Sequence, residues 1–199
     1  IYSKILGLVS LPGRGIKITA LGGPYVLKVG DKIIAKVVDI AMSGWILETN
    51  TAYTAMLNVK DASSRFIKNN EDLSKILAIG EYAVVKITKV TSQNLIDLTM
   101  REPGLHRISG GRIIKINSQK VPRVIGKQGS MISMIKEKTN CRIVVGKNGL
   151  VWLQGEPENE RVAAEAIIMI NEGAHKEGLT ERIEEFINKN CKGGKDEKK

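Results

Sequence analysis

Hydrophobic and polar residues alternate with a period close to two from Lys28 to Arg101, and glycine-containing turns interrupt the alternation. A period of two is typical of strands that bury one face. The pattern predicts five strands, at residues 32–40, 45–48, 53–59, 82–90 and 95–100, with a long polar connection between the third and the fourth. We therefore expect this part of the chain to form a small all-β domain.

A different pattern begins at Gly111, where short strand-like runs mix with runs of helical spacing. A turn signal, Gly-Lys-Asn-Gly, separates two of the strand-like runs. The elements expected are a strand at 111–117, helices at 121–125 and from Ser130, strands at 141–145 and 150–153, and helices at 160–170 and 181–188, the last with Thr180 as its N-cap. This order predicts an α/β module.

The chain opens with two strand-like runs, residues 1–9 and 15–21, joined by a Pro-Gly turn signal. Two strands bury too little to be stable alone, so we expect this segment to pack on the next domain, on a partner or on N-terminal sequence outside this chain. The predicted organisation is a short N-terminal β segment (1–26, incomplete), a β-barrel (27–104), the α/β module with its terminal helix (105–188) and a disordered tail (189–199). The fold class is multi-domain, mainly β plus α/β.

The most specific motif is Gly126-Lys127-Gln128-Gly129, which lies between two predicted helices. Neither glycine has a Cβ, so a phosphodiester backbone can approach closely, and the following helix presents free N–H groups to a phosphate. An ordinary helix–helix turn is the alternative. With its flanking elements, the motif resembles the GXXG loop of a KH domain of the eukaryotic type, a fold that clamps single-stranded RNA or DNA.

The charge of the chain is unevenly distributed. The net charge is +10, and residues 105–147 carry ten Lys or Arg against one acid, whereas residues 148–188 carry three against nine. The positive stretch coincides with the GXXG half of the module and includes Arg123 and Arg142, which we expect to flank the same groove. A nucleic-acid-binding face explains this segregation better than a solvated charged face does.

Other functions find little support in the composition. Two Cys and two His do not make a disulfide framework or a zinc site, and no cofactor motif is present. No paired carboxylates or nucleophile–base pair stands out, so we do not expect an enzyme. The apolar runs are shorter than the ~20 residues of a membrane span, and we expect a protein of the cytoplasm that makes no contact with membrane.

The barrel pattern, from Val29-Gly30-Asp31 to Arg101, is similar to the OB domain of the ribosomal-protein S-one type. The resemblance implies a five-stranded OB barrel that stacks bases on aromatic residues, here Trp45 and Tyr53, although the third strand lacks the His of the family. Trp45 could instead pack against a neighbouring domain. Lys60 and Arg65, on the long connection, are candidates to guide a phosphate backbone.

A short β segment, an S-one-type barrel and one KH domain together resemble the RNA-binding cap subunit of the exosome, of the archaeal ribosomal-RNA-processing-protein-four type. The likeness covers nearly the whole chain and is most specific at residues 121–127. It implies a non-catalytic subunit, three copies of which cap an RNase-PH-like hexameric ring and guide single-stranded RNA into it for 3'-to-5' degradation and processing. The alternative is a free-standing single-stranded nucleic-acid-binding factor in transcription or ribosome assembly.

Overall fold

The computed structural model describes residues 7–11, 13, 15–20, 23–63, 72–173 and 178–191. The chain divides into two compact units, which are described separately. The barrel unit comprises Tyr25–Gly110 and Val145–Leu150, and the KH unit comprises the remaining segments, Ile1–Pro24, Gly111–Val144 and Val151–Lys199.

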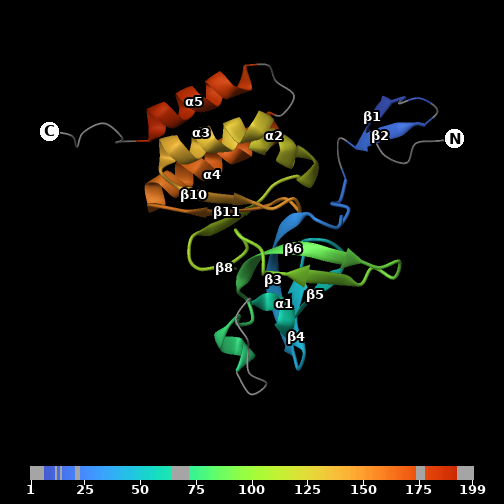
Figure 1. Cartoon of the computed structure of the whole chain (residues 1–199). Helices are drawn as coiled ribbons and strands as arrows, with labels where there is room; N and C mark the ends of the chain where they lie inside the picture. The colour runs from blue at the N-terminus through green and yellow to red at the C-terminus, as the bar shows by residue number, and fades with distance from the viewer. Residues whose placement is uncertain are drawn as a thin grey trace. The chain divides into compact units, whose positions relative to one another are not determined.

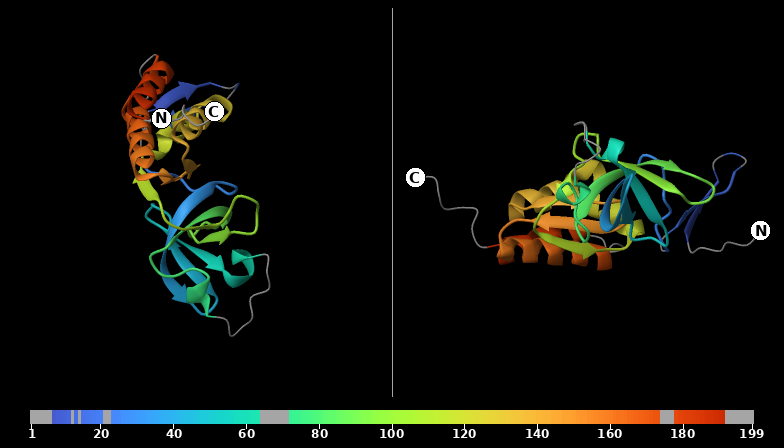
Figure 2. Two further views of the ribbon diagram at one scale, coloured as in Figure 1. Left: turned by 90° about the vertical axis from the view of Figure 1, so that its left-hand side faces the viewer. Right: turned by 90° about the horizontal axis from the view of Figure 1, so that it is seen from below.

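The barrel unit contains the five predicted strands, which close on themselves (Figures 1 and 2). They are β3 (Lys32–Ala41), β4 (Gly44–Glu48), β5 (Thr54–Asn58), β6 (Tyr82–Val90) and β7 (Ile96–Thr99). The sheet runs in the order β3-β4-β5-β7-β6, and the pairing of β3 with β6 closes it, which confirms the five-stranded barrel. A further short strand, β8 (Arg107–Ile108), pairs with the start of β6, and the long connection holds α1 (Val59–Ala62) and the 3-10 turn η1 (Leu73–Lys75).

The barrel core follows the alternation of the sequence. Ile33, Ala35 and Val37 point inward from β3 and are fully buried. Ile34 has the opposite parity and is also fully buried, and Asn148 of the same unit binds its backbone. The Asn148 amide donates to the carbonyls of Ile34 (2.7 Å) and Thr49 (2.8 Å) and accepts from the Ile34 N–H (3.3 Å). Each polar group of this buried side chain is therefore satisfied.

The KH unit has the predicted order of elements, with a three-stranded sheet β10-β11-β9. Its elements are β9 (Arg112–Lys115), η2 (Ser118–Lys120), α2 (Val121–Ile125), η3 (Lys127–Gly129), α3 (Ser130–Thr139), β10 (Arg142–Val145), β11 (Leu150–Gln154), α4 (Pro157–Glu172) and α5 (Leu179–Asn190). Figures 1 and 2 show α3 and α4 on one face of the sheet, and α5 packs on both helices. The order confirms the eukaryotic-type KH fold.

The ends of the chain differ in detail from the prediction. Helix α5 begins at Leu179 after Gly178, so Thr180 lies inside the helix and its assignment as N-cap is wrong. The same helix continues to Asn190, and residues 192–199 of the predicted tail lie outside the described residues. The N-terminal runs form an antiparallel hairpin of β1 (Gly7–Ser10) and β2 (Lys17–Ala20), while residues 1–6 are also outside the described part.

Candidate nucleic-acid interface

The GXXG loop is a sharp turn whose backbone requires glycine. Gly126 has φ of 78°, and a Cβ there would lie 2.7 Å from both the backbone nitrogen and the Cβ of Met131. Gly129 also has a positive φ, 82°, but a Cβ there would meet nothing within 4 Å. Gly126 is therefore needed for its conformation and for close packing, whereas Gly129 is needed for its conformation alone.

The two residues between the glycines are presented to solvent. Lys127 and Gln128 are exposed, and their side chains make no hydrogen bond or ion pair with any residue that the structure describes. Gln128 adopts left-handed backbone angles (φ 53°, ψ 25°), which are unfavourable for a residue with a Cβ. The turn thus places a cation and an amide at its tip, directly before the N-terminus of α3, where the Ser130 N–H donates to the Lys127 carbonyl and the positive end of the helix dipole lies.

The basic residues of the stretch 105–147 fall into two groups. Three are bound within the protein: Arg107 to Glu81, Lys120 to the Asn171 carbonyl (2.6 Å), and Lys138 to Glu184 and Asn188 (both 2.8 Å). The side chains of the others are exposed and have no hydrogen-bond or ion-pair partner among the described residues; these are Arg112, Lys115, Arg123, Lys127, Lys136, Arg142 and Lys147. This second group can offer all of its N–H donors to a polyanion.

The predicted KH site residues share one unit. Arg123 lies on α2, immediately before the loop, and Arg142 is the first residue of β10. Together with the segment from Gly126 to Gly129 they belong to the KH unit and are exposed or partly exposed. Their roles in RNA binding remain predictions, which the exposure of both arginines and the free loop tip support.

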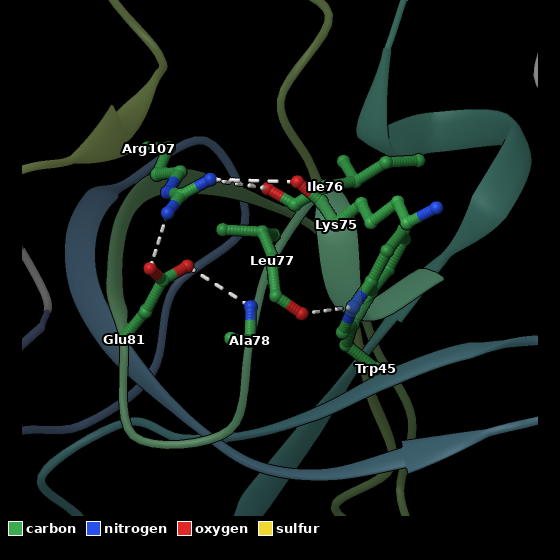
Figure 3. Close-up of polar contacts among 7 residues, drawn as sticks. All are labelled: Trp45, Lys75, Ile76, Leu77, Ala78, Glu81 and Arg107. Atoms are coloured by element: carbon green, nitrogen blue, oxygen red, sulfur yellow. Dashed lines mark hydrogen bonds and ion pairs between the residues drawn. The ribbon is translucent and has the colours of Figure 1, made fainter. Parts of the chain in front are cut away.

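Trp45 does not have the role that the barrel pattern suggested. Its side chain is 0% exposed, and its indole N–H donates to the carbonyl of Leu77 (2.9 Å) (Figure 3). A ring enclosed by the barrel core offers no face to a base, so the prediction that Trp45 stacks on RNA is wrong. It packs within its own barrel, alongside Leu47 and Leu57. The strand pattern carried this signal, because Trp45 and Leu47 have the same parity on β4.

The remaining barrel candidates lie at opposite ends of β5. Tyr53, 45% exposed, precedes the strand in a turn held by Thr49 and Thr51, and Lys60 follows the strand on α1, also exposed. A five-residue strand spans roughly 17 Å, so these two side chains do not form one cluster. Arg65 lies outside the described residues. Tyr53 and Lys60 remain predicted RNA contacts.

Among the described residues, no group of three or more His, Cys, Asp or Glu side chains could hold a metal ion. Burial raises the pKa of the Cys141 thiol, and it also raises that of Cys191, so both thiols are protonated near neutral pH. No helix in the described ranges is both long enough and apolar enough to span a bilayer.

Comparison with known proteins agrees with this architecture. Residues 111–170 match the KH domain family. The chain is similar over 84% of its length to the crystal structure of a candidate exosome complex RNA-binding protein, with a TM-score of 0.76 and 34% identity, and it covers 97% of that protein. A closed OB barrel joined to a KH domain defines the class: two nucleic-acid-binding folds on one chain.

Curated relatives specify the family. The chain is 40% identical over 187 residues to the exosome complex component Rrp4 of Methanothermus fervidus, covering 94% of this chain and 83% of that protein. It is 42% identical over 191 residues to the Rrp4 component of Thermococcus kodakarensis, covering 94% of this chain and 74% of that protein. The chain therefore belongs to the family of the exosome complex component Rrp4.

Proposed function

We propose that this chain is a non-catalytic, RNA-binding cap subunit of an exosome, which captures single-stranded RNA and guides it into a phosphorolytic ring. The observation that carries the proposal is the GXXG loop of a chain belonging to the Rrp4 family. Both glycines hold the backbone of the turn, Gly129 leaves it open to close approach, and Lys127 and Gln128 have no hydrogen-bond or ion-pair partner among the described residues.

The loop supplies three interactions for a phosphodiester. Gly129, where a Cβ would meet nothing within 4 Å, lets the RNA backbone come close, and Lys127 contributes a positive charge. The N–H groups of the first turn of α3 that follow Ser130, whose own N–H donates to the Lys127 carbonyl, can donate to phosphate oxygens. None of these reads a base, so the KH contact holds the strand by its backbone. Exposed Arg123 and Arg142 extend the positive surface from the same unit.

The N-terminal hairpin is a candidate for docking on the ring. Val9 and Ile18 face each other across β1 and β2 and are 62% and 44% exposed, and the neighbouring Leu11 and Ile16 are exposed as well. Exposed apolar residues gathered on a two-stranded hairpin are typical of a surface completed by a partner. We assign this face to an RNase-PH-like ring subunit, with three caps on a hexameric ring, working in the cytoplasm.

RNA binding is tested by fluorescence anisotropy with a labelled single-stranded RNA across a series of salt concentrations. For single strands, log K should fall by about 0.7 per phosphate contacted for each unit of log salt. The variant Lys127→Asp/Gln128→Asp keeps both glycines and should lower affinity by about tenfold. Lys89→Asp/Gln93→Asp is the matched control, because it makes the same charge change at two exposed residues of the barrel unit.

Equal losses of affinity in the two double variants would mean that the loop acts only through its general charge. A wild-type affinity that does not change with salt would refute RNA binding by these cations.

Ring docking is tested by size-exclusion chromatography with a purified ring. Val9→Asp/Ile18→Asp should abolish co-elution and leave RNA affinity of the isolated subunit unchanged. Co-elution that survives this change would remove the hairpin from the interface.

A further inference from the structure

The last part of the long β5–β6 connection is held in place at the end of the barrel. Asp72 begins η1 by accepting hydrogen bonds from the backbone N–H (3.1 Å) and the hydroxyl (2.7 Å) of Ser74. These bonds also hold the pKa of the Asp72 carboxyl below its usual value. Further along, the buried side chain of Leu77 inserts into the barrel core.

Three side chains bind the backbone that leaves η1, and we call them the carbonyl clasp: Arg107, Glu81 and Trp45 (Figure 3). The Arg107 guanidinium donates to the carbonyls of Lys75 (3.5 Å) and Ile76 (3.4 Å) and forms an ion pair with Glu81. Glu81 accepts from the Ala78 N–H (2.9 Å), and the Trp45 indole donates to the Leu77 carbonyl (2.9 Å). Three consecutive carbonyls are thus fixed by donors that belong to barrel strands.

The clasp binds the Lys75 carbonyl and not its side chain, whose charge is near enough to the Asp72 carboxyl to help lower the Asp72 pKa. Figure 3 shows the Lys75 side chain extending away from Arg107 and Glu81. The residue is exposed, and its ammonium group has no hydrogen-bond or ion-pair partner among the residues that the structure describes. Arg107 is the reverse case: it is a cation of the positive stretch whose two terminal nitrogens bind Lys75, Ile76 and Glu81 of its own chain.

We propose that Lys75 is a further phosphate-binding residue for single-stranded RNA. Arg107 is then a positioning residue, which acts through Lys75 by holding the Lys75 backbone in place. This inference rests on the proposed RNA-binding function and extends it to a second surface, the end of the barrel. A cation on an ordered backbone loses less conformational entropy when it binds a phosphate than one on a free loop does. The clasp therefore supplies preorganisation, while Lys75 supplies the charge.

A double-mutant cycle on the full chain tests the inference, with RNA affinity measured by anisotropy. Lys75→Ala should weaken binding about threefold and reduce the salt slope by about 0.7. Arg107→Ala should weaken RNA binding by about the same factor. The double variant should bind no more weakly than either single variant, because both changes remove the same contact. Arg107→Lys, which keeps the charge but cannot bridge two carbonyls and Glu81, should bind as weakly as Arg107→Ala.

Losses that multiply in the double variant, or Arg107→Lys with wild-type affinity, would show that Arg107 contacts RNA itself and would overturn its positioning role. A Lys75→Ala variant with wild-type affinity would overturn the proposal even if the Arg107 variants unfold, because Lys75 contributes only its backbone to the clasp. Lys89→Ala, an exposed lysine at the opposite end of β6, is the matched control and should leave affinity unchanged.

The Lys127→Asp/Gln128→Asp variant separates this inference from the proposed function. If that variant loses affinity and Lys75→Ala does not, the barrel-end contact is wrong and RNA binding by the KH unit stands. If the wild-type chain shows no salt-dependent RNA binding, the proposed function fails first.

Discussion

The GXXG loop of the KH unit and the carbonyl clasp of the barrel unit use similar residues in opposite ways. At the loop, Lys127 and Gln128 are exposed and unpartnered within the described structure, and the backbone is held by glycine conformation. At the clasp, the cation Arg107 and the aromatic Trp45 are directed at backbone carbonyls of their own chain. A residue type that favours RNA binding indicates an RNA contact only where its polar groups are not already satisfied.

The largest effect that we expect comes from Trp45. Trp45→Ala would leave a cavity in the barrel core and should lower the free energy of unfolding by about 3–5 kcal/mol. Trp45→Phe keeps most of the volume and loses the bond to Leu77, so it should cost about 1 kcal/mol. Chemical denaturation measures both values. A Trp45→Ala variant of wild-type stability with reduced RNA affinity would restore the stacking role and remove the contrast between the two regions.

The two loop glycines should differ in stability. Gly126→Ala forces a residue with a Cβ into positive φ and drives that Cβ into Met131, so it should cost about 2–4 kcal/mol. Gly129→Ala meets only the conformational penalty, about 1 kcal/mol. Thermal melts of both variants give the comparison. Equal costs would mean that the α3 end relaxes away from residue 126 and that close packing does not hold the turn.

Two cations of the positive stretch, one without an internal partner and one with, should separate effects on RNA binding from effects on stability. Arg142→Ala removes an exposed arginine without a described partner and should weaken RNA binding about twofold to threefold with an unchanged melt. Lys138→Ala breaks the partly exposed contacts with Glu184 and Asn188, so it should lower stability by about 0.5 kcal/mol and leave RNA affinity unchanged. Anisotropy and melts on the same preparations decide this. The reverse pattern would show that an internal partner does not exclude a cation from RNA binding.

The smallest effect concerns Gln128. Asparagine tolerates left-handed backbone angles better than glutamine, so Gln128→Asn should raise stability by a few tenths of a kcal/mol. It keeps an amide at the loop tip, and RNA affinity should stay within twofold of wild type. Differential scanning calorimetry resolves the shift. A lower melting temperature would mean that the Gln128 side chain makes a stabilising contact at the tip.

Much of the fold could be predicted from local patterns. The period-two runs predicted the five barrel strands, because one face of each strand must be buried. The GXXG motif predicted the turn between α2 and α3, because most residues with a Cβ rarely adopt the backbone angles that this turn requires. The charge segregation identified a stretch that carries seven of the exposed cations without a described partner. These features depend on residues close together in the sequence, so the sequence by itself determined them.

Only the tertiary structure decided which individual side chains remain free. Arg107 and Arg142 belong to the same positive stretch, yet Arg107 binds carbonyls more than thirty residues earlier in the chain and Arg142 does not. Asn148 lies in a turn, where the sequence predicts one, yet its side chain is buried because it binds the backbone of Ile34 and Thr49. Whether a polar group is satisfied depends on partners distant in sequence. Local periodicity therefore predicts the strands and helices, and packing alone selects the residues left to bind RNA.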